Sequence, residues 1–229
     1  MLNQMPPSTT DFFNQISEDY DDVIAKIVPA YREILWAMIY YLPQDFEPRH
    51  ILELGCGTGN LTRLLVERWP NSKITAVDIS SEMLQVIEKK IPSQNIILKE
   101  SSFEALEANQ HEYDLVISSL AIHHLKHPEK VDLLRRIYDW LSPGGFFVIG
   151  DQMIASSTRI AQADVAFYEK LVTTQGATAE ELEQWREHRN NLDHYAKLSD
   201  FNAWFGEAGF SQWDLLWRYL FWSVIQAQK

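Results

Sequence analysis

The amino-acid sequence predicts an α/β domain whose sheet is mostly parallel and ends in an antiparallel hairpin. Short apolar runs alternate with helical patterns over residues 51–149, which is typical of a parallel sheet covered by helices on both faces. A glycine-rich segment follows the first apolar run, and glycines there allow a tight turn against a ligand. Near the C-terminus, residues 213–217 and 219–225 are expected strands with no room for a helix between them. If these two strands pair, they must be antiparallel.

Helices are expected before the sheet. Apolar residues recur at three- and four-residue spacing from Phe13 to Ile27, which predicts an amphipathic helix. Pro29 separates this helix from a second one that runs to about Leu42, because proline disrupts a helix interior.

The elements of the sheet region follow in chain order. We expect strands at residues 51–54, 74–77, 96–98, 114–118 and 146–149. Helices are expected at residues 61–69, after a cap at Ser80 or Ser81, and at 131–141. The turn into the fifth strand is Pro143-Gly144-Gly145.

The pattern changes after Asp151. Residues 152–198 predict helices without strands, and Thr178 to Glu181 fits a capping box. A further helix at about 199–208 ends at Gly209, a residue type suited to a helix C-cap.

Composition narrows the class of protein. The chain has 229 residues, of which 46% are hydrophobic and 23% charged, so it can bury a sizeable core. Its 20 Lys and Arg against 32 Asp and Glu give a net charge of −12. This charge argues against nucleic-acid partners and anionic membrane surfaces, both of which need a basic face.

The single cysteine and the N-terminus set further expectations. Cys56 is alone, so an intrachain disulfide and a cysteine-rich zinc site are excluded. No ligand set for a metal ion is predicted. The first 15 residues lack the pattern of a signal peptide, and no apolar run reaches the roughly 20 residues that span a bilayer. We therefore expect a cytoplasmic protein.

The glycine-rich segment ELGCGTGN holds three of the nine glycines, at positions 55, 57 and 59. It lies between a strand and a helix, whose N-terminus carries partial positive charge. Asp78 ends the next strand, where a carboxylate can accept ribose hydroxyls. Asn60 stands where a dinucleotide fingerprint has its third glycine, and Glu53 suits a cationic ligand rather than a pyrophosphate. These details favour a cationic adenosine cofactor over a dinucleotide, although the glycines alone can also serve as a plain strand–helix turn.

Four segments in order, ILELGCGTGN, TAVDIS, DLVISSLAIHHL and LSPGGFFVIGD, resemble the motifs of class I S-adenosylmethionine-dependent methyltransferases. The resemblance covers about residues 13–229. It implies a Rossmann-like, seven-stranded sheet with an antiparallel terminal strand, and S-adenosyl-L-methionine as the cofactor. It also implies methyltransferase activity.

The same resemblance implies a cofactor contact at each matching position. Glu53 would face the amino end of the methionine part, and Asp78 would bind the ribose. Ser102 stands where the family often has an aspartate at the adenine amino group. The remaining contacts would be Gly55, Cys56 and Gly57 at the methionine, Ile79, Met83 and Phe103 at the adenine, and Ser119 in the wall after the fourth strand.

Both ends of the chain are more narrowly similar to the carboxy-S-adenosylmethionine synthase family, which acts in tRNA wobble-base modification. The similar segments are residues 27–31 and 208–229. Tyr31 matches that family's cofactor-contacting tyrosine, and Arg189 matches the arginine that holds the cofactor carboxylate. The loop departs from the family, which has a GCSxG-type sequence where this chain has GCGTGN. Arg189 would therefore serve a carboxylate either on the cofactor or on the substrate.

His123 and His124 are the candidate catalytic residues. They follow the fourth strand, at the edge where ligands bind in open α/β sheets. Histidine titrates near neutral pH, so one of them could act as a general base. The alternative is that the pair only shapes the loop.

We expect residues 152–198 to form a helical lid over the active site. Cations in this segment of an acidic protein suggest an anionic ligand, because arginine offers a bidentate fork to a carboxylate. The alternative is a solvated helix with surface salt bridges. The candidates are Arg159, Arg186, Arg189, His188, His194 and Tyr195.

The predicted organisation is one methyltransferase domain, residues 1–229. It divides into an N-terminal helical cap (1–47), a cofactor-binding core (48–151), the lid insertion (152–198) and a terminal helix with the antiparallel hairpin (199–229). Five of eight tryptophans follow residue 180, which indicates either core packing of the hairpin or a homodimer interface.

Three functions remain open. The first is a methyltransferase for a small-molecule acceptor that carries a carboxylate. The second is a carboxy-S-adenosylmethionine synthase-like enzyme that uses prephenate. The third is a non-catalytic cofactor-binding protein that regulates a partner.

Overall fold

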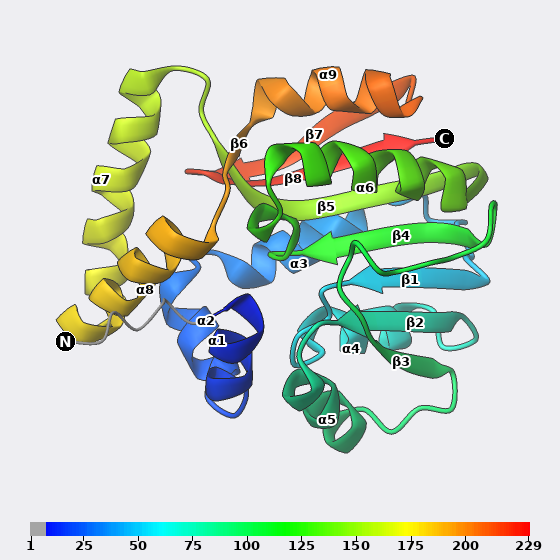
Figure 1. The fold of residues 1–229 in the computed structure, drawn as a ribbon, viewed down its shortest axis with the longest axis horizontal. Coiled ribbons are helices and arrows are strands. Elements are labelled where there is room, and N and C mark those ends of the chain that lie inside the picture. The colour runs from blue at the N-terminus through cyan, green and yellow to red at the C-terminus, as the bar shows by residue number, and fades with distance from the viewer. Residues whose placement is uncertain (1–7) are drawn as a thin grey trace.

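The computed structural model describes residues 8–229, and Figure 1 shows one sheet with helices against both faces. The sheet has eight strands, seven of them in the order β3-β2-β1-β4-β5-β8-β7, and a short β6 pairs with β5. Strands β1 to β5 are parallel, while β8 runs antiparallel to β5 and β7. The strands are β1 (His50–Leu54), β2 (Lys73–Asp78), β3 (Ile96–Glu100), β4 (Tyr113–Ser119), β5 (Leu141–Ile154), β6 (Ala196–Lys197), β7 (Gln212–Tyr219) and β8 (Trp222–Gln228). The predicted Rossmann-like fold with its antiparallel terminal strand is confirmed.

The helices occupy three places around this sheet. One face carries α3, α4 and α5, and the other carries α6 and α9. The helices α1, α2, α7 and α8 gather beyond the end of the sheet (Figure 1). The bounds are α1 (Thr9–Ile16), α2 (Tyr20–Ile27), α3 (Tyr31–Tyr40), α4 (Asn60–Arg68), α5 (Ser81–Lys90), α6 (His127–Trp140), α7 (Thr158–Thr174), α8 (Ala179–Leu192) and α9 (Leu198–Ala208), with a 3₁₀ turn at Ile122–His124.

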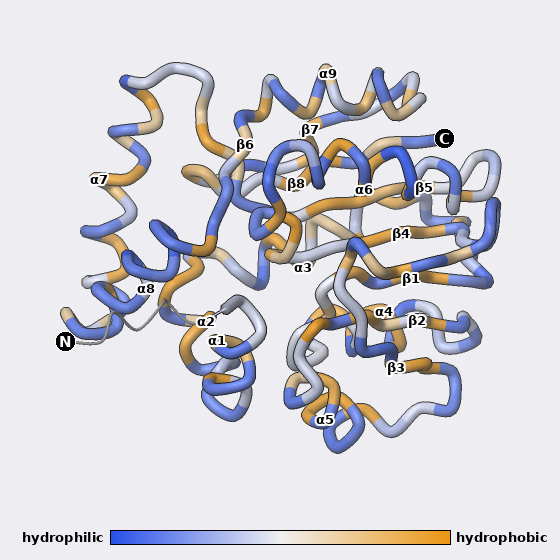
Figure 2. Tube along the Cα trace, in the orientation of Figure 1, coloured by the Kyte–Doolittle hydropathy of each residue, from blue (hydrophilic) through white to orange (hydrophobic). Residues whose placement is uncertain are grey.

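The core follows from strand alternation. Successive side chains of a strand point to opposite faces. In β1, Ile51 packs with the α3–α5 cluster and Leu52 with the α6–α9 cluster. Figure 2 shows the resulting apolar band along β1, β4 and β5, whereas α8 is mostly hydrophilic. Because both faces of the central strands are covered, these strands are apolar throughout rather than alternating with polar residues.

Four local expectations are wrong. The turn expected at Pro143-Gly144-Gly145 lies within β5, which begins at Leu141. The single helix expected from Phe13 to Ile27 is interrupted after Ile16, and a new helix begins at Tyr20. Residues 152–198 are not free of strands, because β5 continues to Ile154 by pairing with β8 and β6. The second hairpin strand starts three residues later than expected, at Trp222, because Leu220 and Phe221 make the turn.

Two sequence signals for helix ends are confirmed. Thr178 Oγ1 accepts the backbone N–H of Glu181, which completes the expected capping box of α8. Gly209 ends α9 with a φ of +108°, the left-handed conformation that glycine adopts without strain.

Within residues 8–229, no helix combines the length and the apolar character that crossing a membrane requires. Residues 1–7, where the expectation about a signal peptide begins, lie outside the described residues. The division of the chain into cap, core, lid and terminal segments stays a prediction.

Candidate active site

The glycine loop lies at the carboxyl end of β1. The backbone N–H groups of Gly55 and Cys56 both donate to the carbonyl of Val77, at 2.8 and 3.0 Å. Gly55 has a φ of +72°, and a Cβ atom there would collide with the Cβ of Ala121. The loop therefore requires glycine at position 55, both for its backbone conformation and for its close approach to the segment after β4.

Asp78 is held rigidly at the end of β2. One carboxylate oxygen accepts the N–H of Gly57 at 2.8 Å, and the other accepts the N–H of Ser80 at 2.9 Å. Burial raises the pKa of Asp78, and these N–H donors offset part of that rise. Each oxygen keeps a second lone pair, so the carboxylate can also accept hydroxyl groups of a ligand.

A first cavity of about 840 Å³ opens in front of the loop. Its wall includes the Asp78 carboxylate and several apolar side chains. The buried Ser119 hydroxyl, also in the wall, has no hydrogen-bond partner among residues 8–229. An apolar slot, a carboxylate and a spare hydroxyl fit the adenine and ribose of the expected cofactor. The predicted residues that line this cavity are Gly55, Gly57, Asp78, Ile79, Met83, Ser102, Phe103 and Ser119.

Three other predicted residues are buried outside this wall. Glu53 lies behind the loop, where its carboxyl group accepts the Thr62 hydroxyl at 2.7 Å and burial raises its pKa to about 8. Cys56 is buried, and burial raises the pKa of its thiol well above the ordinary value. Tyr31 starts α3, and burial likewise raises its pKa. None of the three side chains contributes to the lining of the first cavity.

The N-terminal helices are fastened to the glycine loop. Asp21 on α2 accepts hydrogen bonds from Thr58 at 2.5 Å and from Asn60 at 2.8 Å, and it pairs with Lys90 of α5 at 2.5 Å. Asn14 on α1 accepts the Ser80 hydroxyl at 2.6 Å. These contacts hold α1 and α2 across the carboxyl ends of the strands, and no sequence motif predicts them.

A second cavity of about 670 Å³ lies beside the first. It is bounded by α2, α7, α8 and the turn of the C-terminal hairpin. Four residues line both cavities: Phe13, Tyr20, Leu120 and His124. A ligand in one cavity is therefore separated from a ligand in the other only by this shared wall.

Arg189 and Arg186 both line the second cavity, but their surroundings differ. Arg186 pairs with Glu169 at 3.0 Å and with Glu183 at 3.2 Å. Within residues 8–229, no carboxylate pairs with Arg189. Its guanidinium is therefore the cation of this cavity best able to bind an anionic ligand. Of the remaining lid candidates, His188 and Tyr195 line the cavity, whereas Arg159 and His194 do not.

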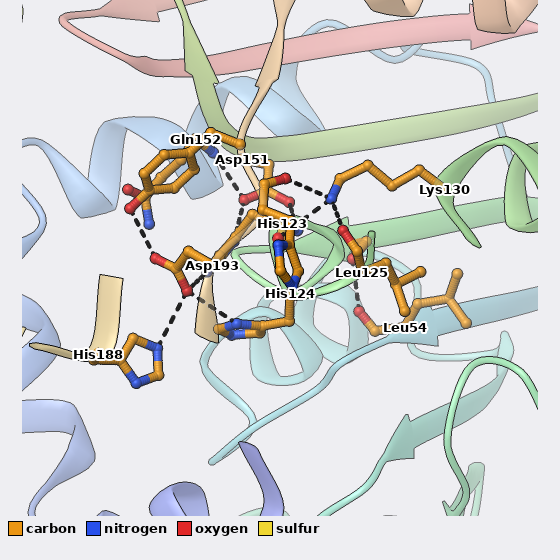
Figure 3. Close-up of polar contacts among 12 residues, drawn as sticks. Leu54, His123, His124, Leu125, Lys130, Asp151, Gln152, His188 and Asp193 are labelled. Carbon is orange, nitrogen blue, oxygen red and sulfur yellow. Dashed lines mark hydrogen bonds and ion pairs between the residues drawn. The ribbon is translucent and has the colours of Figure 1, made fainter. Parts of the chain in front are cut away.

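His123 and His124 meet two carboxylates from distant parts of the chain (Figure 3). Asp151 of β5 contacts Nδ1 of His123 at 2.5 Å and also accepts the His123 backbone N–H. Asp193, just after α8, lies 3.1 Å from Nδ1 of His124. Asp193 also accepts the Tyr195 hydroxyl at 2.7 Å.

The two histidines therefore have opposite pKa shifts. For His123, burial lowers the pKa, but the Asp151 and Asp193 carboxylates outweigh it and raise the pKa above its usual value. For His124, burial and the neighbouring His123 lower the pKa to about 4. At neutral pH His124 is thus uncharged, and it is the histidine of the pair that lines both cavities.

Sequence reasoning missed Asp151 as a partner of His123 and did not single out Asp193. Both are carboxylates without a local motif, and they lie 28 and 70 residues beyond His123 in the chain. The helical pattern from Phe13 to Ile27 includes Phe13 and Tyr20 but predicts no contact of either residue with a ligand. No local pattern marks these four residues, because the contacts that define their role join separate elements.

Comparisons with known proteins agree with this geometry. A family model described as a methyltransferase domain matches residues 51–145. A carboxy-S-adenosyl-L-methionine synthase from Campylobacter curvus is 27% identical over 80% of this chain and 78% of its own length. A trans-aconitate 2-methyltransferase from Rhodopseudomonas palustris is 32% identical over 58% of this chain and 50% of its own length.

The fold also matches a solved structure. It is the phosphoethanolamine N-methyltransferase 2 of Haemonchus contortus, in complex with phosphomonomethylethanolamine and S-adenosylhomocysteine. The TM-score is 0.65 at 17% identity, and the match covers 92% of this chain and 47% of that one. At this identity the likeness concerns the fold alone.

Proposed function

Because this chain belongs to the class I S-adenosylmethionine-dependent methyltransferases, we propose that it methylates a small molecule that carries a carboxylate. The observation that carries the proposal is the shared wall between the two cavities, with Arg189 in the second cavity and the predicted cofactor residues around the first. The acceptor would occupy the second cavity, with its carboxylate against the Arg189 guanidinium.

The first cavity would hold the cofactor through the residues that the sequence predicts and that line this cavity. Asp78 would accept the ribose hydroxyls, Ile79 and Met83 would flank the adenine, and Ser119 would offer its unpaired hydroxyl. S-adenosylmethionine supplies an activated methyl group on a sulfonium ion. Gly55 and Gly57 would let the methionine part lie against the loop backbone.

The protein's own contribution to the reaction is chiefly positioning. Methyl transfer is an in-line displacement, so holding the donor methyl group and the acceptor in contact where the two cavities adjoin would remove much of the entropic barrier. Phe13, Tyr20 and Leu120 would exclude water from that region. An acceptor that must lose a proton needs a base, and His124 is uncharged at neutral pH and lines both cavities.

The substrate of one relative supports the proposal that the acceptor carries a carboxylate. The printed name of the Rhodopseudomonas palustris protein identifies its acceptor as trans-aconitate, which is a tricarboxylate. An acidic protein with net charge −12 repels anions at long range, so a carboxylated acceptor needs a local cation. Arg189 is placed to supply it.

A second candidate is a carboxy-S-adenosylmethionine synthase-like reaction with prephenate. The observation that favours it is the similarity to the Campylobacter curvus synthase, which extends over 80% of this chain. In that reaction Arg189 would bind a carboxylate carried by the cofactor product rather than by an acceptor.

One experiment separates the two. The purified protein is incubated with methyl-labelled S-adenosylmethionine and a metabolite extract, and products are identified by mass spectrometry. A labelled carboxylic acid or ester, together with S-adenosylhomocysteine, is expected. A cofactor that gains a carboxyl group when prephenate is added would support the synthase reaction instead. Cofactor binding without either product would contradict both and indicate a regulatory protein.

A further inference from the structure

Three imidazoles converge on one carboxylate oxygen at the edge of the second cavity. Asp193 Oδ1 lies 3.1 Å from His124 Nδ1, 3.4 Å from His188 Nε2 and 3.6 Å from His123 Nε2. The residues come from three places: the turn after β4, the last turns of α8 and the segment after it (Figure 3). All four side chains are at most 11% exposed.

Hydrogen bonds do not account for this convergence. Both ring nitrogens of His124 and of His188, and Oδ1 of Asp193, are buried without a hydrogen-bond partner within residues 8–229. Leaving a buried polar group unpaired costs about 1–3 kcal/mol. Three of these five atoms, His124 Nδ1, His188 Nε2 and Asp193 Oδ1, meet at one place and can share a partner that the side chains themselves do not provide.

We propose that His123, His124 and Asp193 bind a divalent transition-metal ion of the zinc class, with His188 beside them against Asp193. The ligand atoms of His123, His124 and Asp193 lie within 4.8 Å of one another, close enough to share one ion. Nitrogen and oxygen ligands about 2.1 Å from a tetrahedral ion are separated by roughly 3.4 Å. The three nitrogen–oxygen distances, 3.1 to 3.6 Å, match such edges.

The surrounding contacts orient the ligands as metal sites require. Asp151 holds Nδ1 of His123 at 2.5 Å, which directs Nε2 toward Asp193. A carboxylate behind a metal-binding histidine fixes the tautomer of the ring and increases its basicity. Tyr195 donates its hydroxyl to the other oxygen of Asp193 at 2.7 Å, so Oδ1 stays directed at the histidines.

Lys130 fixes the backbone on both sides of the cluster. Its ammonium group is buried and donates to the carbonyl oxygens of His123 and Leu125 and, at 2.7 Å, to that of His194. It therefore ties the turn after β4 to the segment after α8. The ligands thus belong to rigidly connected segments, as a preorganised ion site requires.

The choice of metal follows from the ligand chemistry. Two or three neutral imidazoles with one carboxylate suit Zn²⁺ and neighbouring first-row ions, whereas Mg²⁺ and Ca²⁺ prefer oxygen ligands. This proposed metal site differs from the expectation from the sequence, which predicted no ligand set for a metal ion. If the proposed function holds, an acceptor oxygen in the second cavity could complete the coordination, because His123, His124, His188 and Asp193 all line that cavity. His124 would then serve as a metal ligand rather than as a base.

The test uses the full chain without acceptor or added cofactor. Protein stripped with a chelator is titrated with Zn²⁺ by calorimetry and with Co²⁺, whose visible absorption reports tetrahedral nitrogen and oxygen ligands. We expect one ion per chain and tetrahedral cobalt bands. Asp193→Asn and His188→Gln should weaken Zn²⁺ binding at least tenfold. His50→Gln, at the opposite end of β1, should bind normally.

Several outcomes would overturn the site. These are no stoichiometric binding, octahedral cobalt bands, or binding that survives both substitutions. Circular dichroism checks that each variant folds, and His124→Gln replaces any variant that does not. Because these measurements involve neither methyl donor nor acceptor, their failure leaves the proposed function intact, and the absence of methyl transfer would leave the metal site intact.

Discussion

The two cavities differ in how the chain builds them. The first is formed by consecutive strand ends, loops and helix starts of the core, from Gly55 to Glu129, with residues of α1 and α2 added from outside. The second gathers residues from α2, the turn after β4, α7, α8 and the C-terminal hairpin. The residues of the first cavity belong to local sequence motifs, whereas those of the second are brought together by long-range packing.

The strongest expected effect is at the glycine loop. Gly55→Ala should weaken S-adenosylmethionine binding by about 100-fold or more, since the new Cβ must displace Ala121 and the residue keeps a positive φ. Calorimetric titration with the cofactor measures this. Gly206→Ala on α9 is the control, because nothing lies within 4 Å of its added Cβ. Equal affinity of the two variants for S-adenosylmethionine would contradict a role of the loop in binding the cofactor.

Asp78→Asn is expected to weaken cofactor binding by about 30-fold. The substitution removes a charged acceptor worth about 2 kcal/mol to ribose hydroxyls. An asparagine oxygen can still accept one of the two backbone N–H groups that hold the carboxylate. Asp45→Asn, at an exposed position away from the cavity, should bind normally. A ribose contact would be contradicted if the variant bound the whole cofactor with unchanged affinity but bound the methionine part alone more weakly.

Arg189→Gln tests the second cavity alone. We expect KM for a carboxylated acceptor to rise about tenfold, because a charge-assisted hydrogen bond is lost, while the cofactor Kd stays unchanged. Arg186→Gln is the matched control, because its guanidinium is already paired with Glu169 and Glu183. A cofactor Kd that rises with Arg189→Gln would instead place the carboxylate on the cofactor, in favour of the synthase-like reaction.

The smallest effect concerns Glu53 and pH. Burial raises its pKa to about 8 in the folded protein, from an ordinary value of 4.5. A raised pKa gives stability that is fully present below pH 4.5 and is lost as pH rises toward 8. At pH 8 the melting temperature of ligand-free Glu53→Gln should therefore be roughly 2–4 °C higher than that of the unmodified chain. This shift corresponds to a gain of about 1 kcal/mol in unfolding free energy.

That difference should shrink on lowering the pH to 5.5, where Glu53 is protonated in the folded state. Melting curves at several pH values measure it, with Glu67→Gln on the exposed face of α4 as the control. A melting difference that is independent of pH would contradict a neutral, buried Glu53.

Most of the first cavity could be anticipated. Eight of the predicted cofactor residues line it, because each occupies a strand end or helix start that the alternation of elements defines. The prediction failed to foresee that Glu53, Cys56 and Tyr31 are buried behind the wall. The position of a residue in a strand does not show whether its side chain points into a cavity or is covered by the next helix. Thr62 of α4 covers Glu53 in this way.

The fold class, the glycine loop with Asp78 and the capping of α8 can be predicted from the sequence, because each depends on periodicity or on contacts within a few residues. The position of Arg189, in a cavity that shares lining residues with the first, follows from the tertiary structure. The tertiary structure alone brought Asp151, His188 and Asp193 to the two histidines. Their positions follow from how helices 158–174 and 179–192 pack beyond the sheet, and such packing is fixed by many weak contacts between distant segments rather than by any local pattern.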